Sequence, residues 1–341
     1  MPAGFTPILL VTVDGQPVAT PFYSRLVELK LRDEEGDAVD SLTLKFDDAD
    51  NAVALPRKGA RIAVSLGYKE TGLVDKGMFQ VETTPIEGDV DSGEFISVTA
   101  NAVDLRKDAK GEGSKAYENK SLGAIVRAEA AKMKVSAVIA PELDGVQIDY
   151  ELRNGQSHID FVSRLVGEYG GLAKFAGGKL IIQKRGGAQS GSGQALAPII
   201  IRKSDCKSWR ITPEGRMQYG EIQAHWLDKV SGKRKTEKLK TGLQGPSFTL
   251  REDFSDQSRA KKGAEAEKGR LNRSTGNGSF EMFGRPEAQA GAPVQTIGFR
   301  DGISGDWIAS AVEHAFTPGG GYITTVDVKS KDDGKSGPAK D

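Results

Sequence analysis

The chain has 341 residues, 38% hydrophobic and 28% charged, which is ordinary for a globular protein and long enough for two or three domains. Its 47 Lys and Arg are balanced by 47 Asp and Glu, so the formal net charge is zero. Nucleic-acid binders usually carry a basic excess because neutralised phosphates supply most of their affinity, so this balance argues against that class. A neutral chain is also poorly protected against self-association, which suits a subunit of an assembly.

The single cysteine, Cys206, excludes an intrachain disulfide, and we interpret it as an unreactive thiol. The apolar run from Ile8 to Val13 has no basic segment before it and ends at the turn residues Asp14 and Gly15. This pattern is typical of a first strand and not of a signal peptide. Because no run approaches the ~20 apolar residues of a membrane span, we expect no stable membrane insertion.

Residues 1–105 show the two-residue period of β-strands throughout. Two successive runs alternate with polar residues and place on their apolar faces Val27, Leu29 and Leu31, then Leu42, Leu44 and Phe46. The acidic segments 33–37 and 47–50 fall at strand ends, where we interpret them as solvated turns. The pattern predicts a first barrel-like β domain over 1–105.

Residues 106–194 are predicted to form an α+β middle domain and a linker. Residues 106–120 are polar and are interpreted as a crossing between domains, after which Ser121 caps a helix. Ser157 and Asp160 have the spacing of a capping box, followed by apolar residues at helical period, and Gly170 with Gly171 ends that helix. A hairpin follows over 172–183, and 186–194 is a flexible linker by composition.

Residues 195–330 return to the β pattern and predict a second barrel-like β domain. A helix with Ala260, Ala264 and Leu271 on one side is expected as an insertion over 255–272. The last hairpin turns through Gly319–Gly321, and 331–341 is interpreted as a polar tail. The fold class is therefore mainly β with an α+β insertion. Both halves show a strand–turn–strand opening, at 25–46 and 209–239, but no duplication is detectable by residue identity.

The sequence predicts neither catalytic nor cofactor residues. The histidines at 158, 225 and 314 have no partners at metal-ligand spacing, and His225 and His314 are expected to face away from their apolar neighbours. The Gly-rich segments 186–193 and 275–278 lack the spacing of a phosphate-binding loop. No pair of carboxylates is indicated that could serve a glycosidase. We therefore predict that the protein is not an enzyme and has no metal or cofactor.

One local concentration of charge stands out, the basic hairpin from Lys229 to Lys240. Its candidate interface residues are Lys229, Lys233, Arg234 and Lys235. A solvated hairpin is the plain interpretation; the alternatives are contact with an acidic neighbour in an assembly, or with nucleic acid.

The helix and hairpin over 156–185, with L-V-G-E-Y-G-G followed by G-G-K-L, resemble the phage late control D family. Further segments agree in order along the chain, at 31–42, 55–59, 120–126, 224–228, 283–287 and 307–314. Members of this family are hubs of contractile-tail baseplates and are similar to the hub region of type VI secretion spike (VgrG) proteins. The resemblance covers nearly the whole chain.

The resemblance implies two barrel-like β domains per chain, which form a pseudo-six-fold ring as a homotrimer. Such a ring would join a trimeric spike protein to a hexameric tail tube protein and contact baseplate wedge proteins and the tape-measure protein. The particle could be a phage or a tail-like bacteriocin such as an R-type pyocin, assembled in the bacterial cytoplasm. The alternatives are a tail-associated peptidoglycan hydrolase and a DNA-binding late regulator, the latter disfavoured by the charge balance.

Overall fold

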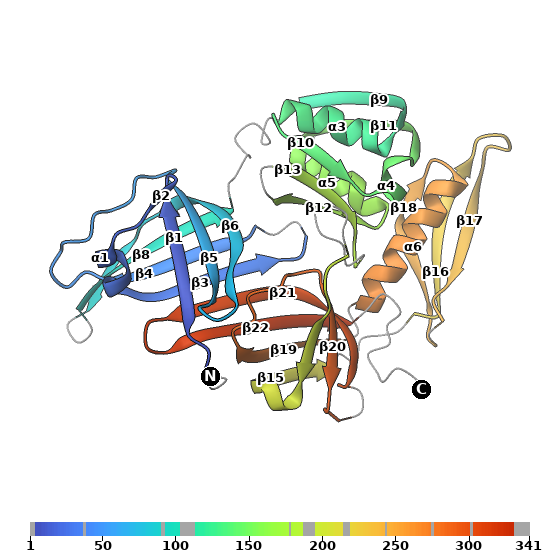
Figure 1. Cartoon of the computed structure of the whole chain (residues 1–341). Helices are drawn as coiled ribbons and strands as arrows, with labels where there is room; N and C mark the ends of the chain where they lie inside the picture. The colour runs from blue at the N-terminus through green and yellow to red at the C-terminus, as the bar shows by residue number, and fades with distance from the viewer. Residues whose placement is uncertain are drawn as a thin grey trace.

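Figure 1 shows the computed structural model of the chain, whose elements form four groups, one of them inserted within another in the chain. The structure describes residues 4–36, 39–89, 93–102, 113–176, 179–186, 195–213, 219–242, 244–273, 276–300 and 303–330. Most of the linker 186–194 and the tail 331–341 therefore lie outside the described residues. As expected, the chain is mainly β with helices interspersed between several sheets.

The first β unit is a set of antiparallel strands around one apolar core. Its elements are β1 (Pro7–Val13), β2 (Gln16–Pro17), α1 (Thr20–Arg25), β3 (Leu26–Glu34), β4 (Ser41–Asp47), β5 (Arg61–Tyr68), β6 (Gly72–Thr83), β7 (Ile86–Asp89) and β8 (Gly93–Ala102). The predicted alternation is confirmed in β4, where Leu42, Leu44 and Phe46 are buried. In β3 it is wrong at Val27, which is exposed, because a register shift between Leu26 and Glu28 turns Leu26 into the core instead.

The middle unit packs three helices against short sheets. It comprises β9 (Gly113–Ser121), α3 (Leu122–Lys132), β10 (Ser136–Ile139), α4 (Pro141–Asp144), β11 (Gln147–Gln156), α5 (His158–Glu168), β12 (Gly171–Ala176) and β13 (Lys179–Lys184). Part of the segment expected to be a crossing is thus the strand β9, paired with β11. The sequence of β9 lacks the apolar alternation of a half-buried strand, because Tyr117 is its one buried residue.

The start and end of α5 follow from its sequence as predicted. Ser157 is the N-cap: its Oγ accepts a hydrogen bond from the Asp160 N–H at 3.2 Å and donates one to Asp160 Oδ2 at 2.6 Å. Gly170 follows the helix with a φ of +71°, which costs glycine little and lets the chain turn into β12. Helix and hairpin then bury Val162, Leu165 and Leu180 in one core.

The second β unit is built from β14 (Ile199–Arg202), β15 (Cys206–Pro213), β19 (Gly276–Phe283), β20 (Pro293–Ile297), β21 (Gly305–Thr317) and β22 (Gly321–Ser330). An inserted unit lies between β15 and β19 in the chain: β16 (Glu221–Asp228), β17 (Lys233–Lys240), β18 (Ser247–Phe254) and the helix α6 (Gln257–Arg273). Ala260 and Ala264 of α6 are buried against Ile222 and Ala224 of β16 in a core of their own.

The two β units form one continuous fourteen-stranded sheet. The link is β21 of the second unit, which pairs antiparallel with β3 of the first from Ala311↔Glu34 to Phe316↔Leu29. In Figure 1 the two units accordingly lie side by side, with the middle and inserted units beyond them. Segments nearly three hundred residues apart in the chain thus share main-chain hydrogen bonds.

The strand order of the second β unit repeats that of the first. The first runs β3-β4-β8-β6-β5-β1 and the second β15-β19-β22-β21-β20-β14, so strands in the same chain order have the same neighbours. One difference is direction, since β1 is antiparallel to β5 and β14 is parallel to β20. The counterpart of the strand pair at 25–46 is therefore β15 with β19, and not the segment 209–239, because the inserted unit separates the two strands.

We predict that Ser157→Ala destabilises the middle unit by about 1 kcal/mol, because the first turn of α5 loses its cap. Chemical denaturation followed by circular dichroism measures the change. The matched control is Ser136→Ala, an exposed serine at the start of β10. Equal stabilities of the Ser157→Ala and Ser136→Ala proteins would contradict the role given to this cap.

Candidate functional site

The basic hairpin predicted over Lys229–Lys240 is confirmed as a structural element. β16 and β17 pair antiparallel from Glu221↔Lys240 to Asp228↔Lys233. The hairpin lies on the opposite side of Figure 1 from the first β unit. At its tip Val230 is 97% exposed, and β17 is an edge strand whose many lysines discourage pairing with another strand.

The four candidate interface residues do not form one concentrated positive patch. Three of them are paired within the chain: Lys229 with Asp149 (Nζ–Oδ2 3.8 Å), Arg234 with Asp253 (Nη2–Oδ1 2.6 Å) and Lys235 with Asp228 (Nζ–Oδ2 2.7 Å). Lys233 makes no ion pair with the described residues. These exposed pairs add little stability but neutralise much of the hairpin's charge. Contact of the hairpin with a partner protein stays a prediction.

The histidines lie in three different parts of the fold. His158 Nδ1 contacts the buried Glu129, and His225 Nδ1 lies 2.9 Å from Thr236 Oγ1. His314 is fully buried, so the expectation that it faces away from the apolar side is wrong. It shares a strand face with the buried Val312, and Lys76 of the first β unit contacts it there. Within the described ranges, no three or more His, Cys, Asp or Glu side chains gather as metal ligands.

His314 joins a polar cluster buried between the two β units. Its Nδ1 lies 2.8 Å from Tyr322 Oη and 3.1 Å from Thr324 Oγ1, and its Nε2 lies 3.0 Å from Lys76 Nζ of the first unit. Burial and the nearby Lys76 charge hold the pKa of His314 well below its usual value. Burial also lowers the pKa of Lys76 to about 8. His314 is therefore a neutral, structural residue of this contact.

A second contact joins the first β unit to the middle unit through Lys174 of β12. Its Nζ lies 2.6 Å from Asp33 Oδ1 and 3.0 Å from Asp40 Oδ1, and it donates to the Glu34 carbonyl at 2.8 Å. Burial opposes the charge of Lys174, but the two carboxylates outweigh it and raise its pKa. Burial raises the pKa of Asp40 to about 6 although Lys174 acts against it.

The interpretation of the acidic segment 33–37 as a solvated turn is wrong at its first residue. Asp33 uses one oxygen for Lys174 and the other to accept a hydrogen bond from the Ala290 N–H at 2.8 Å, in the second β unit. One carboxylate of the first β unit thus contacts both the middle unit and the second β unit. The sequence holds no signal for this, because an acidic residue at a strand end is equally typical of an exposed turn.

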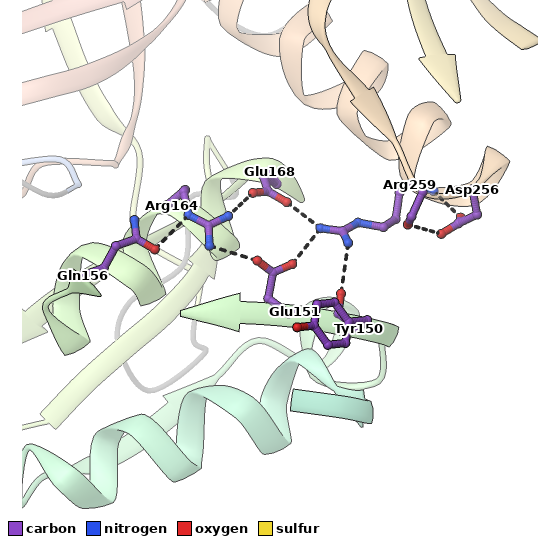
Figure 2. A network of polar contacts seen from close by, with 8 residues as sticks. Tyr150, Glu151, Gln156, Arg164, Glu168, Asp256 and Arg259 are labelled. Carbon is purple, nitrogen blue, oxygen red and sulfur yellow. Dashed lines mark hydrogen bonds and ion pairs between the residues drawn. The ribbon is translucent and has the colours of Figure 1, made fainter. Parts of the chain in front are cut away.

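A third contact holds the inserted unit to the middle unit (Figure 2). Arg259 of α6 donates to Glu151 of β11 at 2.8 Å, to Glu168 of α5 at 2.9 Å and to the Tyr150 carbonyl at 3.3 Å. Arg164 of α5 bridges the same two carboxylates from the other side. The two carboxylates lie between two guanidinium groups, an arrangement that fixes the orientation of the helix α6.

Lys76, Lys174 and Arg259 thus each serve a contact between two units. Burial raises the pKa of the Cys206 thiol, consistent with an unreactive cysteine. No helix among the described residues is long and apolar enough to cross a membrane. The arrangement can hold four units in fixed relative positions, which is the property of a building block.

We predict that Lys174→Met destabilises the protein by roughly 3 kcal/mol at neutral pH, because Asp33 and Asp40 lose the cation between them. The loss should be smaller at pH 5, where Asp40, with a pKa of about 6 even beside Lys174, is protonated. Denaturant unfolding at both pH values measures this, with the exposed Lys179→Met as control. A loss that is independent of pH would contradict the role of the carboxylates.

We predict that His314 makes the protein less stable in mild acid. Its pKa is lowered on folding, so below the ordinary value of 6.5 the unfolded chain binds more protons than the folded one, and stability falls as the pH falls. Unfolding free energies between pH 7 and 5 should decrease less steeply in His314→Gln than in the wild type. An unchanged slope in His314→Gln would contradict the assignment.

Comparison with known proteins gives one consistent result. The chain is 27% identical to the probable baseplate hub protein of Escherichia phage P2, over 95% of this chain and 93% of the relative. It is 24% identical to the probable baseplate hub protein of Escherichia phage 186, with the same coverage. No family model matches the chain.

Solved structures share the fold at low sequence identity. The 43 kDa tail protein of prophage MuSo2 from Shewanella oneidensis superimposes with a TM-score of 0.72 at 13% identity, covering 96% of this chain and 99% of that one. An Escherichia coli component of the type VI secretion system gives a TM-score of 0.55 at 12% identity, covering 96% and 79%. The expected resemblance is confirmed: over nearly its whole length this chain is similar to phage baseplate hub proteins and has the fold of phage tail proteins.

Proposed function

We propose that the protein is the structural hub of a contractile-tail baseplate. In this role it is a homotrimer that adapts a three-fold spike to a six-fold tail tube and performs no chemistry itself. The observation that carries the proposal is the repeated strand order of the two β units, because three chains then supply six topologically equivalent units around one axis. Similarity to probable baseplate hub proteins over 95% of the chain supports it.

The partners follow from this position in the particle. One face of the ring binds the trimeric spike protein and the other the hexameric tail tube protein, while the periphery meets baseplate wedge proteins and the tape-measure protein. The basic hairpin with Lys229, Lys233, Arg234 and Lys235 projects from the inserted unit and is proposed to contact a neighbouring protein. The protein would be assembled in the bacterial cytoplasm into a virion tail or a tail-like bacteriocin particle.

Contacts between the units support the proposed structural role. Three polar contacts join side chains of different units: Lys174 with Asp33, Lys76 with His314, and Arg259 with Glu168. These contacts hold each unit in place relative to the others. A symmetry adaptor requires this, because six positions around a tube must be presented with fixed spacing.

Sedimentation velocity tests the proposal. We expect a species of three times the chain mass of 36.4 kDa, for the protein alone or in the presence of the spike protein. A chain that stays monomeric with the spike protein present would overturn the hub assignment. Clearing of cell walls by the purified protein would instead favour a peptidoglycan hydrolase, and a salt-dependent mobility shift of DNA would favour a regulator.

A further inference from the structure

The strands β15 and β7 of the fourteen-stranded sheet each have an open edge in the part of the chain that the structure describes. β15 ends the path of paired strands on one side, with β19 as its partner. β7 pairs with β8 and with no other described strand. Apolar side chains are exposed at both edges: Ile86 of β7 is 52% exposed and Trp209 of β15 is 42% exposed. Open edges with exposed apolar groups are where another strand can add.

The chain contains the kind of junction that would cover such edges. Inside each chain, β21 of the second β unit pairs with β3 of the first, with His314↔Leu31, Ala315↔Lys30 and Phe316↔Leu29 among its pairs. Leu29 and Leu31 are buried there. Next to these pairs, Arg32 of β3 lies 3.8 Å from Glu313 of β21, so a basic residue meets an acidic one across the two strands.

The hairpin that contains β21 has a counterpart in the first β unit, residue for residue. β21 pairs with β22 from Trp307↔Ser330 to Thr317↔Gly321, with a register shift between Ala309 and Ala311. β6 followed by β7 pairs with β8 from Phe79↔Ala102 to Asp89↔Gly93, with a register shift between Val81 and Thr83. The same register places Ile86, Glu87 and Gly88 where the second unit has His314, Ala315 and Phe316.

The strand β3 has an equally close counterpart in β15. β3 pairs with β4 at Leu26↔Phe46, shifts register, and continues at Leu29↔Leu44 and Leu31↔Leu42. β15 pairs with β19 at Cys206↔Met282, shifts register at the same point, and continues at Trp209↔Phe280 and Ile211↔Gly278. Trp209, Arg210 and Ile211 therefore correspond to Leu29, Lys30 and Leu31. The counterparts of the two strands of the internal junction thus both have open edges, on β7 and on β15.

We infer that the open edge at β7 of one protomer pairs antiparallel with β15 of a second copy of this chain. The register copied from the internal junction sets Ile86 opposite Ile211, Glu87 opposite Arg210 and Gly88 opposite Trp209 of the neighbour. This inference rests on the proposed homotrimeric hub and names its interface. Repeating one head-to-tail junction within and between chains closes a ring.

Charge and backbone chemistry both fit this pairing. β7 carries Glu87 at the middle position and β15 carries Arg210, so the facing pair has opposite charge. Pro85 precedes β7, but its carbonyl accepts a hydrogen bond from the Ser97 N–H of β8 at 3.0 Å. In an antiparallel strand the N–H and the carbonyl of one residue point to the same side. The N–H that proline lacks would therefore have pointed to β8, and its absence removes no donor from the open edge of β7.

Disulfide cross-linking tests the pairing in the assembled protein. In a Cys206→Ser background, chains with Glu87→Cys are co-expressed with chains with Arg210→Cys, and the trimer is purified alone or with the spike protein. Side chains directly opposite in an antiparallel pair have Cβ atoms about 4.5–5.5 Å apart, near the separation that a disulfide spans. We expect oxidation to give a covalent dimer containing one chain of each kind.

The matched control replaces Arg210→Cys by Lys207→Cys, three residues away along the same strand and about 10 Å distant. It should cross-link at least tenfold less. Charge reversal gives a second readout: Glu87→Arg and Arg210→Glu should each weaken trimer formation by about tenfold, and the double variant should restore it.

The outcomes separate this inference from the proposed function. A trimer that forms without cross-linking through positions 87 and 210, or that tolerates both charge reversals, would overturn the strand pairing while the hub proposal stands. A chain that forms no trimer in any condition would overturn both. Cross-linking equal to that of the control would also exclude the proposed register.

Discussion

The pairing of β21 with β3 is the contact on which the rest of the structure depends. Six residue pairs, from Ala311↔Glu34 to Phe316↔Leu29, join strands from opposite ends of the chain into one sheet. The contacts of Lys76 with His314 and of Arg32 with Asp327 form only once these strands lie together. Main-chain pairing sets the distance and direction between the units, and the side chains then select a single arrangement.

Partly buried charges make that arrangement specific. Lys174 lies between Asp33 and Asp40, and Arg259 lies between Glu151 and Glu168. Such pairs add little net stability compared with apolar residues, but leaving one partner without the other is costly. A different orientation of the units would leave these charges without their partners. The charged side chains therefore make alternative packings of the units unfavourable. In the proposed symmetric assembly, that cost would keep the units of every copy in the same arrangement.

The two β units share their strand order and register, although no similarity between them is detectable by residue identity. For example, Leu44 corresponds to Phe280, and Phe79 corresponds to Trp307. Different apolar residues can occupy equivalent positions because a buried strand face requires only apolar side chains at alternate positions. The inserted unit between β15 and β19 hides the repeat further, because it separates two strands that are neighbours in the sheet. Both β units therefore keep one scaffold while insertions give the chain its asymmetric features.

Local physical chemistry determined what the sequence by itself could reveal. The cap at Ser157, the positive φ of Gly170 and the alternation in Leu42, Leu44 and Phe46 each depend on a few neighbouring residues, so all three could be predicted. The similarity to baseplate hub proteins could also be recognised from the sequence, because the shared motifs occur in the same order along the chain. Tertiary structure alone decided the burial of His314, the two contacts of Asp33, the bulge that exposes Val27 and the repeat itself. Each of these arises from pairing between residues far apart in the chain, and a strand's own sequence does not specify which strand will lie beside it.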